Sequence, residues 1–412
     1  MNIIKNKQYF KFCTYGFLKN LRFFDAFFIL FLIEKGLSFT QIGILYAVRE
    51  IIINILEIPS GIIADTFGRK KSLIVSFFIY IISFSVFYLS SGFWFFLIAF
   101  ILYGIGDAFR TGTHKGIIMD YLKLKHWEEQ KINYYGHTRS WSQKGSAISA
   151  LIAGLIVFYS GNYQNIFLYS IFPYLFNLIL IISYPKEFNR SIEQINSKSS
   201  IGIRLTTKSF FRTIKQPNVL KIINTAAVHS AYQRAVKDYI QPLMVNVALI
   251  IPIMLNVEIE KKNGIIIGVI YFFIYLLTSR ASKLSSKVAA KNKKRISYIT
   301  LLLGFTSGII CGVFYISELW IFSLIAFIVI YIIENIRKPI LTGFIADNVT
   351  NEILTSIISA QSLLKTAITV ILAIVFGILV DHFGIGISFV VVSIFLILST
   401  VLFNMSSAKS KN

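Results

Sequence analysis

Long apolar stretches separated by short polar turns run along most of the chain. Each stretch has about 20 residues with few charges, which is the length that a helix needs to cross a bilayer. Lipid leaves no water for backbone polar groups, so each stretch is expected to be helical. A turn or interfacial segment is expected over 246–262, where Pro242 and Pro252 interrupt the pattern. The pattern predicts twelve spans, at roughly 12–33, 41–64, 72–90, 93–117, 141–160, 164–184, 218–245, 264–279, 296–316, 319–342, 355–380 and 386–404.

The composition supports a membrane protein. Of 412 residues, 55% are hydrophobic and only 15% are charged, and the mean hydropathy is +0.69. Soluble domains have about 25% charged residues. The chain is therefore predicted to be an all-α integral membrane protein, and no polar stretch is long enough for a soluble catalytic domain.

The net charge of +22 follows the predicted topology. Lys and Arg gather in alternate connections, whereas the opposite turns contain only Lys35, Lys261 and Lys262. This asymmetry is the positive-inside pattern, and it predicts a multi-pass protein of the inner or plasma membrane with both termini in the cytoplasm. The basic balance therefore does not indicate a nucleic-acid partner.

One long hydrophilic stretch, rich in Lys, Arg, Ser and Asn, divides the spans into two sets of six. We predict an N-terminal six-helix bundle over 1–184, a basic cytoplasmic linker over 185–216, and a C-terminal six-helix bundle over 217–412. Such a linker is expected to lie near anionic lipid headgroups.

The two halves repeat weakly. The first span contains Arg22 and Asp25, and the seventh contains Arg234 and Asp238, each pair about halfway along its span. Residues three or four apart share a helix face, so each half places an Arg and an Asp together at similar depth. Paired halves with polar groups near the midplane are typical of secondary transporters.

The connection after the second span reads Gly61-Ile-Ile-Ala-Asp65-Thr-Phe-Gly68-Arg69-Lys70-Lys. Its spacing resembles the loop between helices 2 and 3 of major facilitator superfamily transporters. The span count, the two halves and the connector agree with this resemblance, which implies a fold of twelve helices in two six-helix bundles.

The resemblance also implies roles in the loop. Asp65 would sit at a cytoplasmic helix junction and help to hold the outward-open state, with Arg69 and Lys70 in the same charge network. Gly61 would permit close helix approach, and Gly68 suits a tight turn. The alternative interpretation is a solvated turn with positive-inside charges.

The second half departs from this pattern. The matching segment, 279–287, keeps positive charge but lacks the glycines and the aspartate. A partial echo, Gly377-Ile-Leu-Val-Asp381-His-Phe-Gly384, falls on an outer turn. Phe100 stands where many drug antiporters of this family have an Arg linked to proton coupling, which weakens that assignment.

Ionisable residues inside a bilayer are functional candidates because each is costly unless it is paired or hydrated. The resemblance places helices 1, 4, 7 and 10 around a central cavity. Two interpretations of their charges remain open: local pairs that stabilise the helices, or arginines that hold an anionic group. Arg337, near the end of its span, is expected to snorkel to the interface. The candidate substrate-binding residues are Arg22, Arg110, Arg234 and Lys237, and the acids pairing locally would be Asp25, Asp107, Asp238 and Glu334.

Proton coupling needs a carboxylate that changes charge between two states. The acids of the tenth span are not among the candidates, and His229 is interpreted as a satisfied interior histidine rather than a titrating group. Glu50 and Glu57 lie on one polar face of the second span, for which helix packing is the alternative role. The candidate proton-coupling residues are Asp25, Glu50, Glu57 and Asp107.

These features predict a secondary transporter that moves a small organic solute, anionic or zwitterionic, by alternating access with proton coupling. Its expected partners are the solute, protons and the lipid bilayer, with no nucleic acid, and a monomer is expected. No cofactor, metal or enzymatic activity is predicted, because no phosphate-cradling loop, metal-ligand spacing or nucleophile–base constellation is present. His114 and Asp120 have one residue too many between them for an acyltransferase pair. The alternatives are a drug or metabolite exporter, a lipid-handling member of the same fold, and a non-transporting membrane receptor or scaffold.

Overall fold

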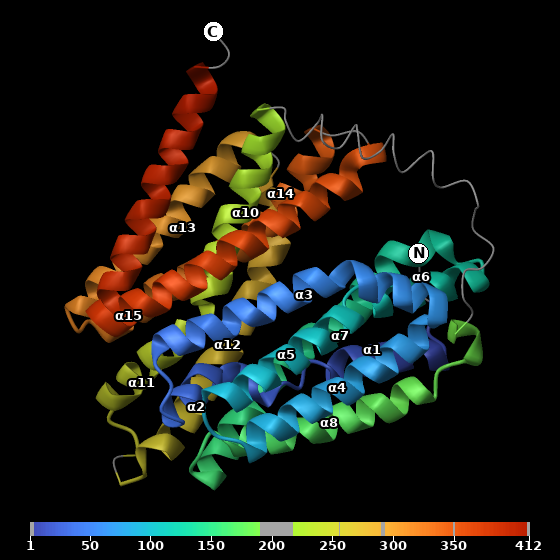
Figure 1. Cartoon of the computed structure of the whole chain (residues 1–412), viewed down its shortest axis with the longest axis horizontal. Helices are drawn as coiled ribbons and strands as arrows, with labels where there is room; N and C mark the ends of the chain where they lie inside the picture. Colours follow the sequence, from blue (N-terminus) through green and yellow to red (C-terminus); the bar gives the residue numbers. More distant parts are fainter. Residues whose placement is uncertain (1–3, 190–216, 255, 290–292, 349–350, 410–412) are drawn as a thin grey trace. The chain divides into compact units, whose positions relative to one another are not determined.

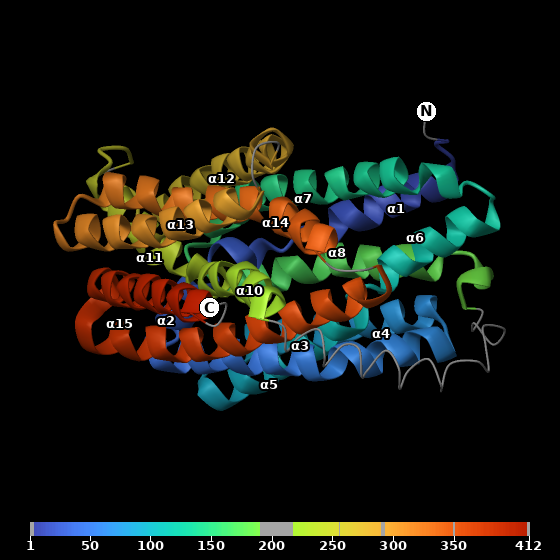
Figure 2. The same cartoon turned by 90° about the horizontal axis from the view of Figure 1, so that it is seen from above.

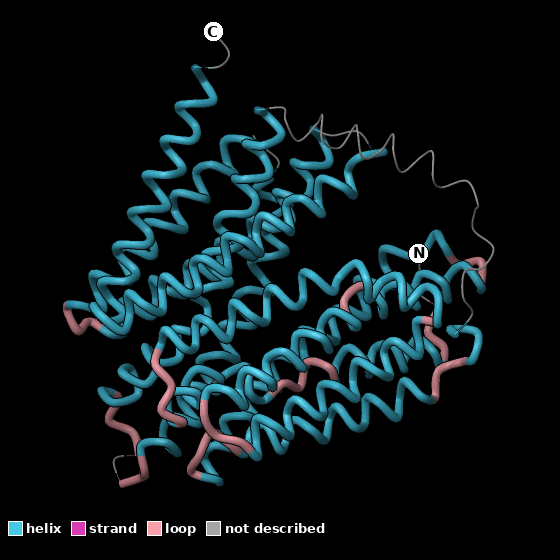
Figure 3. Tube along the Cα trace, viewed as in Figure 1, coloured by secondary structure: helices cyan, strands magenta, loops and turns pink. Residues whose placement is uncertain are grey.

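The computed structural model describes residues 4–189, 217–254, 256–289, 293–348 and 351–409. These residues form helices and loops without any strand (Figures 1 and 3). The predicted all-α class with twelve spans is confirmed. Most of the predicted linker over 185–216 lies outside the described residues, so the division at that linker stays a prediction.

The helices group into two compact units, each of which is described by itself. The first unit consists of Met1–Leu37, Val48–Gln194 and Ala248–Tyr275. Within it, α4 packs against α5 and α8, and α1 packs against α7 (Figures 1 and 2). Its elements are α1 (Lys7–Leu18), η1 (Phe23–Ala26), α2 (Phe28–Glu34), most of α3 (Phe39–Phe67), α4 (Arg69–Leu89), α5 (Phe93–Arg110), α6 (Thr113–Leu124), η2 (Glu128–Gln130), α7 (Lys131–Ser160), α8 (Asn165–Ile182), η3 (Lys186–Asn189) and the first half of α12 (Ile259–Ala289).

The second unit consists of Ser38–Ala47, Ile195–Val247 and Leu276–Asn412. Here α13 packs against α14 and α15, and α10 packs against α15 and α14. Its elements are the start of α3, α10 (Pro217–Val236), η4 (Lys237–Tyr239), nearly all of α11 (Ile240–Ile250), the end of α12, α13 (Lys293–Ile316), α14 (Trp320–Asn348) and α15 (Asn351–Lys409). The expected turn in 246–262 falls between Ile250 and Ile259, and α15 contains the last two predicted spans on either side of a kink at Gly384.

Eight described helical stretches are long and apolar enough to cross a membrane. The others belong to predicted spans that are interrupted, such as α1–α2 and α10–α11, or to the charged helix α3. A membrane leaves backbone groups unsatisfied wherever a helix breaks, so such breaks persist where protein or water can satisfy them. The interruptions therefore mark positions at which polar chemistry is expected.

A row of glycines on α13 brings it close to its neighbours in the second unit. Gly304, Gly308 and Gly312 recur every four residues and so share one face. A Cβ added at Gly304 would overlap the His229 ring, and one added at Gly308 would overlap Tyr232 and Ser393. Small residues at this spacing allow helices to pack closely in a bilayer. This packing matters below, because it confines His229.

Candidate functional site

Three helix interruptions coincide with the charged residues singled out in the sequence. Arg22 immediately precedes η1, which contains Asp25 and separates α1 from α2. Lys237 begins η4, which separates α10 from α11. Between α5 and α6, Gly112 has φ +80°, a conformation that side chains with a Cβ rarely adopt, and it follows closely after Arg110. Broken helices near the middle of a span are where secondary transporters place binding groups.

The first unit contains a group of charged and phenolic side chains, here called the arginine cluster, formed by Arg22, Asp25, Tyr80, Tyr103, Asp107 and Arg110. Arg110 Nη2 lies 2.6 Å from Asp107 Oδ1. Arg110 Nε donates to the Tyr80 hydroxyl at 2.9 Å, and that hydroxyl donates to Asp107. The Asp107 side chain is 14% exposed and that of Arg110 is 21% exposed, so this half of the cluster is partly open.

Arg22 forms the other half of the arginine cluster. Its Nε lies 3.3 Å from Asp25 Oδ2, and its Nη1 donates to the Tyr103 hydroxyl at 2.7 Å. Arg22 Nε nevertheless has no hydrogen-bond partner among the described residues, and neither does Ser149 Oγ. Both residues line a small polar cavity of about 10 Å³, with room for roughly one water. Unsatisfied buried donors are destabilising, so this cavity is suited to a polar guest.

Local pairing, one of the two interpretations left open, describes Arg22 and Arg110 in this structure. Each arginine lies beside an aspartate three residues away. In the second unit, Lys237 Nζ lies 3.5 Å from Asp238 Oδ1, and the Lys237 carbonyl accepts from Tyr331 at 2.8 Å. Arg22 and Arg110 belong to the first unit whereas Arg234 and Lys237 belong to the second, so a site shared by all four stays a prediction.

Glu50 and Glu57, both on α3, differ in their surroundings. Glu50 is 3% exposed and accepts from Arg49 Nη2 at 3.1 Å, while Glu57 is exposed. Arg49 also lies over the ring of Tyr103, 5.9 Å from its centroid, so Glu50 connects to the arginine cluster. Sequence reasoning missed Arg49, although its position beside Glu50 could have suggested the pair.

Two expectations about α14 were wrong. Arg337 does not snorkel: it is 1% exposed and donates to the carbonyls of Ser297 and Thr225. Glu334 does not bond to Arg337 but accepts from Ser230 and bonds to His229. The helix packing of the second unit brings these groups from three helices together, which no spacing within one helix could reveal.

The loop between α3 and α4 forms a charge network on the first unit. Gly68 has φ +103° and directly precedes α4. Arg69 pairs with Asp65 at 3.0 Å and also with Asp120 of α6 at 2.7 Å. A Cβ at Gly116 would collide with the Arg69 guanidinium, so this glycine leaves room for the link to α6.

Two other residues of this loop behave differently. Lys70 is buried and donates to the Tyr184 carbonyl at 2.6 Å, so it ties α4 to the residues that follow α8. A Cβ added at Gly61 would meet no described atom within 4 Å, so close helix approach at Gly61 stays a prediction. Sequence reasoning considered Asp120 only together with His114 and missed its pairing with Arg69, although Gly116 and Asp120 repeat the Gly61 and Asp65 spacing.

The partial echo of this loop has a local role in the second unit. Asp381 accepts from the backbone N–H groups of Phe39 and Thr40, at 2.9 and 2.7 Å. It therefore caps the first turn of α3, whose N–H groups have no partner within the helix. Gly377 lies against the Phe39 carbonyl, which a larger residue would displace.

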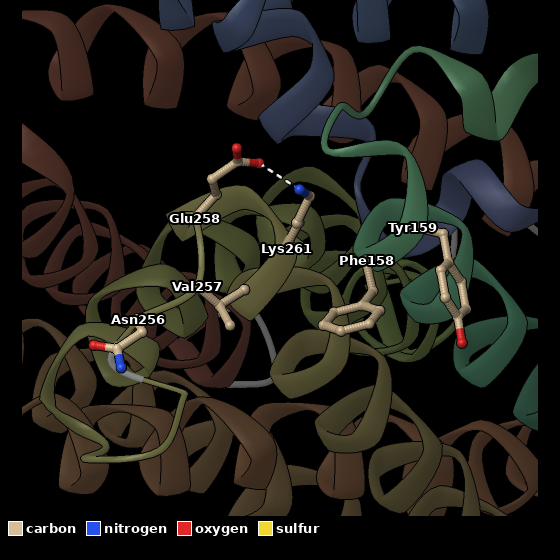
Figure 4. Close-up of a pocket in the computed structure, with 6 residues that line it drawn as sticks. All are labelled: Phe158, Tyr159, Asn256, Val257, Glu258 and Lys261. Carbon is tan, nitrogen blue, oxygen red and sulfur yellow. Dashed lines mark ion pairs between the residues drawn. The ribbon is translucent and has the colours of Figure 1, made fainter.

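A larger cavity of about 390 Å³ lies on the first unit, away from the predicted site residues. Figure 4 shows Phe158 and Val257 beside the ion pair of Lys261 and Glu258, whose atoms are 2.8 Å apart. The Glu258 side chain is 65% exposed, so the cavity opens to the surroundings. It contains none of the charged groups of the interrupted helices.

Long apolar helices with interruptions at internal charges define a multi-pass membrane protein of the transporter class. The sequence profile of the Major Facilitator Superfamily matches residues 16–304, and the chain belongs to this family of membrane transporters for small solutes. The predicted resemblance is thereby confirmed.

Individual relatives agree with this assignment. The chain is 23% identical over 393 residues to "Uncharacterized MFS-type transporter YxaM" of Bacillus subtilis (strain 168), covering 93% of this chain and 91% of that protein. Its fold resembles the crystal structure of the nucleoside transporter NupG, with a TM-score of 0.73, 11% identity, and coverage of 97% of each chain. It also resembles the D-xylose-proton symporter, with a TM-score of 0.67, 15% identity, and coverage of 96% and 95%. Identities this low show a common fold and no common substrate.

Proposed function

We propose that the protein is a secondary active transporter that moves a small anionic or zwitterionic organic solute by alternating access, coupled to protons. The observation that supports this solute class is Arg22, whose buried Nε makes no hydrogen bond among the described residues and which lies beside an Asp three residues away. A guanidinium matches carboxylate or phosphate geometry in a bidentate manner. An adjacent Asp suits the ammonium group of a zwitterion.

In this proposal, Arg22 and Arg110 bind the solute from the first unit, and Arg234 and Lys237 from the second. The proton-coupling candidates that the sequence offers are Asp25, Glu50, Glu57 and Asp107, all of the first unit. The solute and the protons are its soluble partners, and the protein acts as a monomer in the inner or plasma membrane with both termini cytoplasmic. The carboxylates close to Arg22 and Arg110 exchange partners when the solute binds.

The loop containing Gly61, Asp65, Gly68, Arg69 and Lys70 serves as a gate in this proposal. Arg69 lies between Asp65 and Asp120, which join α3 and α6 through one guanidinium. Exposed ion pairs contribute little to stability, so they can break and re-form during a cycle. A complete network of this kind favours a transporter over a receptor or scaffold, which needs no such gate.

Thermal stabilisation of the detergent-purified full chain tests the solute class. A panel of anionic, zwitterionic, cationic and neutral solutes is compared, because a ligand that binds only the folded state stabilises it by about 2.7 kcal/mol at 100 times its Kd. A saturable shift with anions or zwitterions that disappears in Arg22→Gln and persists in Arg139→Gln supports the proposal. Arg139 is an exposed arginine of α7 and is the matched control. Shifts with cationic amphiphiles alone would favour the exporter instead.

A further inference from the structure

The second unit contains a buried pair of titratable side chains that the proposed binding groups do not include. His229 of α10 is fully buried, and its Nδ1 lies 2.8 Å from Glu334 Oε2 of α14. Ser230 donates to the other carboxylate oxygen of Glu334 at 2.6 Å. The Glu334 side chain is 13% exposed, so the carboxylate is the more accessible member of the pair.

The hydrogen bonds specify how many protons the pair holds. Both oxygens of Glu334 are occupied, one by the Ser230 hydroxyl and one by the imidazole. With Glu334 as a carboxylate, the imidazole donates from Nδ1–H, and in the neutral imidazole Nε2 then has a lone pair rather than a proton. Nε2 has no hydrogen-bond partner among the described residues, which is tolerable for a lone pair and costly for an N–H group. The pair in this form therefore holds one proton and has room for one more.

The surroundings of the pair restrict where that second proton can go. A Cβ at Gly304 of α13 would overlap Nε2, and the Phe305 ring lies 5.8 Å from the imidazole. From α15, Ser393 forms a hydrogen bond with Tyr232 on the next turn of α10. Arg337 of α14 is the other charged group acting on the imidazole and on Glu334. With Nε2 enclosed by α13, a proton reaches the pair through the more accessible Glu334.

Three of the candidate acids of the first unit are less suited to exchange a proton. Asp25, Glu50 and Asp107 each lie within 3.3 Å of an arginine. Each of these carboxylates therefore already has a permanently charged ion-pair partner, because arginine keeps its proton at every accessible pH. His229 differs, because a histidine can share or release a proton near physiological pH. Glu334 thus has the partner that proton exchange needs.

We propose that His229 and Glu334 form the proton-binding site that couples transport to the proton gradient, an inference that rests on the proposed function. One proton enters at the Glu334 carboxylate and forms an O–H bond there. The net charge of the pair rises by one, and no other bond forms or breaks. Neutralising Glu334 weakens its bond to His229 and its attraction to Arg337, which changes how α10 packs on α14.

Infrared difference spectroscopy of the purified full chain tests proton binding with the proton itself as the probe. Spectra are recorded between about pH 5 and pH 8, the range over which histidine titrates. The wild type is expected to gain the carbonyl stretch of a protonated carboxyl group at low pH. This band is expected to vanish in Glu334→Gln and to remain in Glu187→Gln, where the exposed glutamate of η3 is the matched control. A wild type without the band, or a band that is lost in Asp107→Asn or Glu50→Gln instead, would overturn the proposal.

A pair of glycine variants covers the case in which Glu334→Gln does not fold. Gly304→Ala places a methyl group against the His229 ring, while Gly308→Ala places one against Tyr232 and Ser393 on the next turn. The same substitution on one face of α13 therefore disturbs either the His229–Glu334 pair, at Gly304, or the adjacent Tyr232 and Ser393, at Gly308. Gly304→Ala is expected to change the proton affinity of the carboxyl by about tenfold, equal to one pH unit in the titration. Equal titrations in both variants would contradict the assignment.

Transport measurements separate this inference from the proposed function. In liposomes, Glu334→Gln is expected to abolish accumulation driven by a pH gradient while keeping solute exchange without a gradient. The solute used is the one that gives the largest thermal shift in the panel. Equal loss of accumulation and exchange would overturn the coupling role. If the infrared band depends on Glu334 but no panel solute binds or exchanges, the proton site stands and the proposed transport of an anionic or zwitterionic solute fails.

Discussion

The arginine cluster of the first unit and the His229–Glu334 pair of the second differ in exposure and in the partner of each carboxylate. The arginine cluster of the first unit is partly open, pairs each carboxylate with an arginine, and adjoins a small polar cavity. The His229–Glu334 pair of the second unit is nearly enclosed and pairs the carboxylate with a histidine. An arginine keeps its neighbour charged and attracts anions, whereas a histidine allows the proton count to change. In our proposals, the proton binds only in the second unit, whereas the solute contacts charged residues of both units.

The largest expected effect is on the free energy of unfolding, and it distinguishes the buried Arg337 from the partly exposed Arg22. Arg337→Met removes a guanidinium that donates to Ser297, Thr225 and Thr300, and it leaves buried acceptors unsatisfied. We expect a loss of about 3 kcal/mol in unfolding free energy, because each orphaned buried group is costly. Arg22→Met, at a partly exposed position, is expected to lose about 1 kcal/mol or less. Denaturant titration in mixed micelles measures both, and equal losses would remove the distinction between buried and open clusters.

The next effect concerns transport kinetics. Arg22→Gln is expected to raise the apparent KM for the solute by about tenfold, which corresponds to roughly 1.4 kcal/mol of lost binding, without altering the pH dependence of the rate. Glu334→Gln is expected to do the reverse and flatten the pH dependence while the KM stays close to that of the wild type. Initial rates of uptake across a pH series measure both variants. A flattened pH profile in Arg22→Gln would show that the units share the proton-binding role.

A smaller effect is expected at Asp107, within the arginine cluster. Asp107→Asn keeps an acceptor for Tyr80 but removes the charge that faces Arg110. Since both side chains are partly exposed, the expected stability loss is about 1 kcal/mol after screening by solvent. The freed Arg110 should bind anions more strongly, which thermal shifts with the panel can detect. Unchanged anion binding would mean that Arg110 has only a structural role.

The smallest stability effect is expected at the gate. Asp65 and Asp120 are 53% and 39% exposed, so replacing either with Asn should change the unfolding free energy by less than about 1 kcal/mol. Solute exchange should nevertheless slow in both variants, because each variant loses one of the two ion pairs that Arg69 forms. Exchange rates measured at saturating solute test this expectation. Wild-type exchange in Asp65→Asn would refute the gating role.

Much of the fold could be predicted from the sequence. The positions of the spans follow from the apolar stretches, since the hydrophobic thickness of a bilayer sets the length of each helix. The charges of the first and seventh spans were also visible as local features, whereas the break at Gly112 within the predicted span 93–117 was not predicted. Pairs within one turn, such as Arg22 with Asp25, needed only helix geometry.

Pairs between helices could not be predicted in this way. Asp120 reaches Arg69 because Gly116 leaves room between α6 and α4, and Arg49 joins Glu50 to the arginine cluster through Tyr103. The error at Arg337 has the same origin. A position near the end of a span predicts snorkelling only if no neighbouring helix supplies acceptors, and α13 and α10 supply them.

The sequence by itself determined a helical membrane protein, because the hydrophobic length of each segment acts independently of its neighbours. Only the tertiary structure decided which charges meet. His229 was a lone histidine in an apolar stretch until α14 placed Glu334 beside its Nδ1 and Gly304 of α13 enclosed its Nε2. Distances between helices depend on how side chains of every size pack across them, and the pattern along one helix does not contain that information.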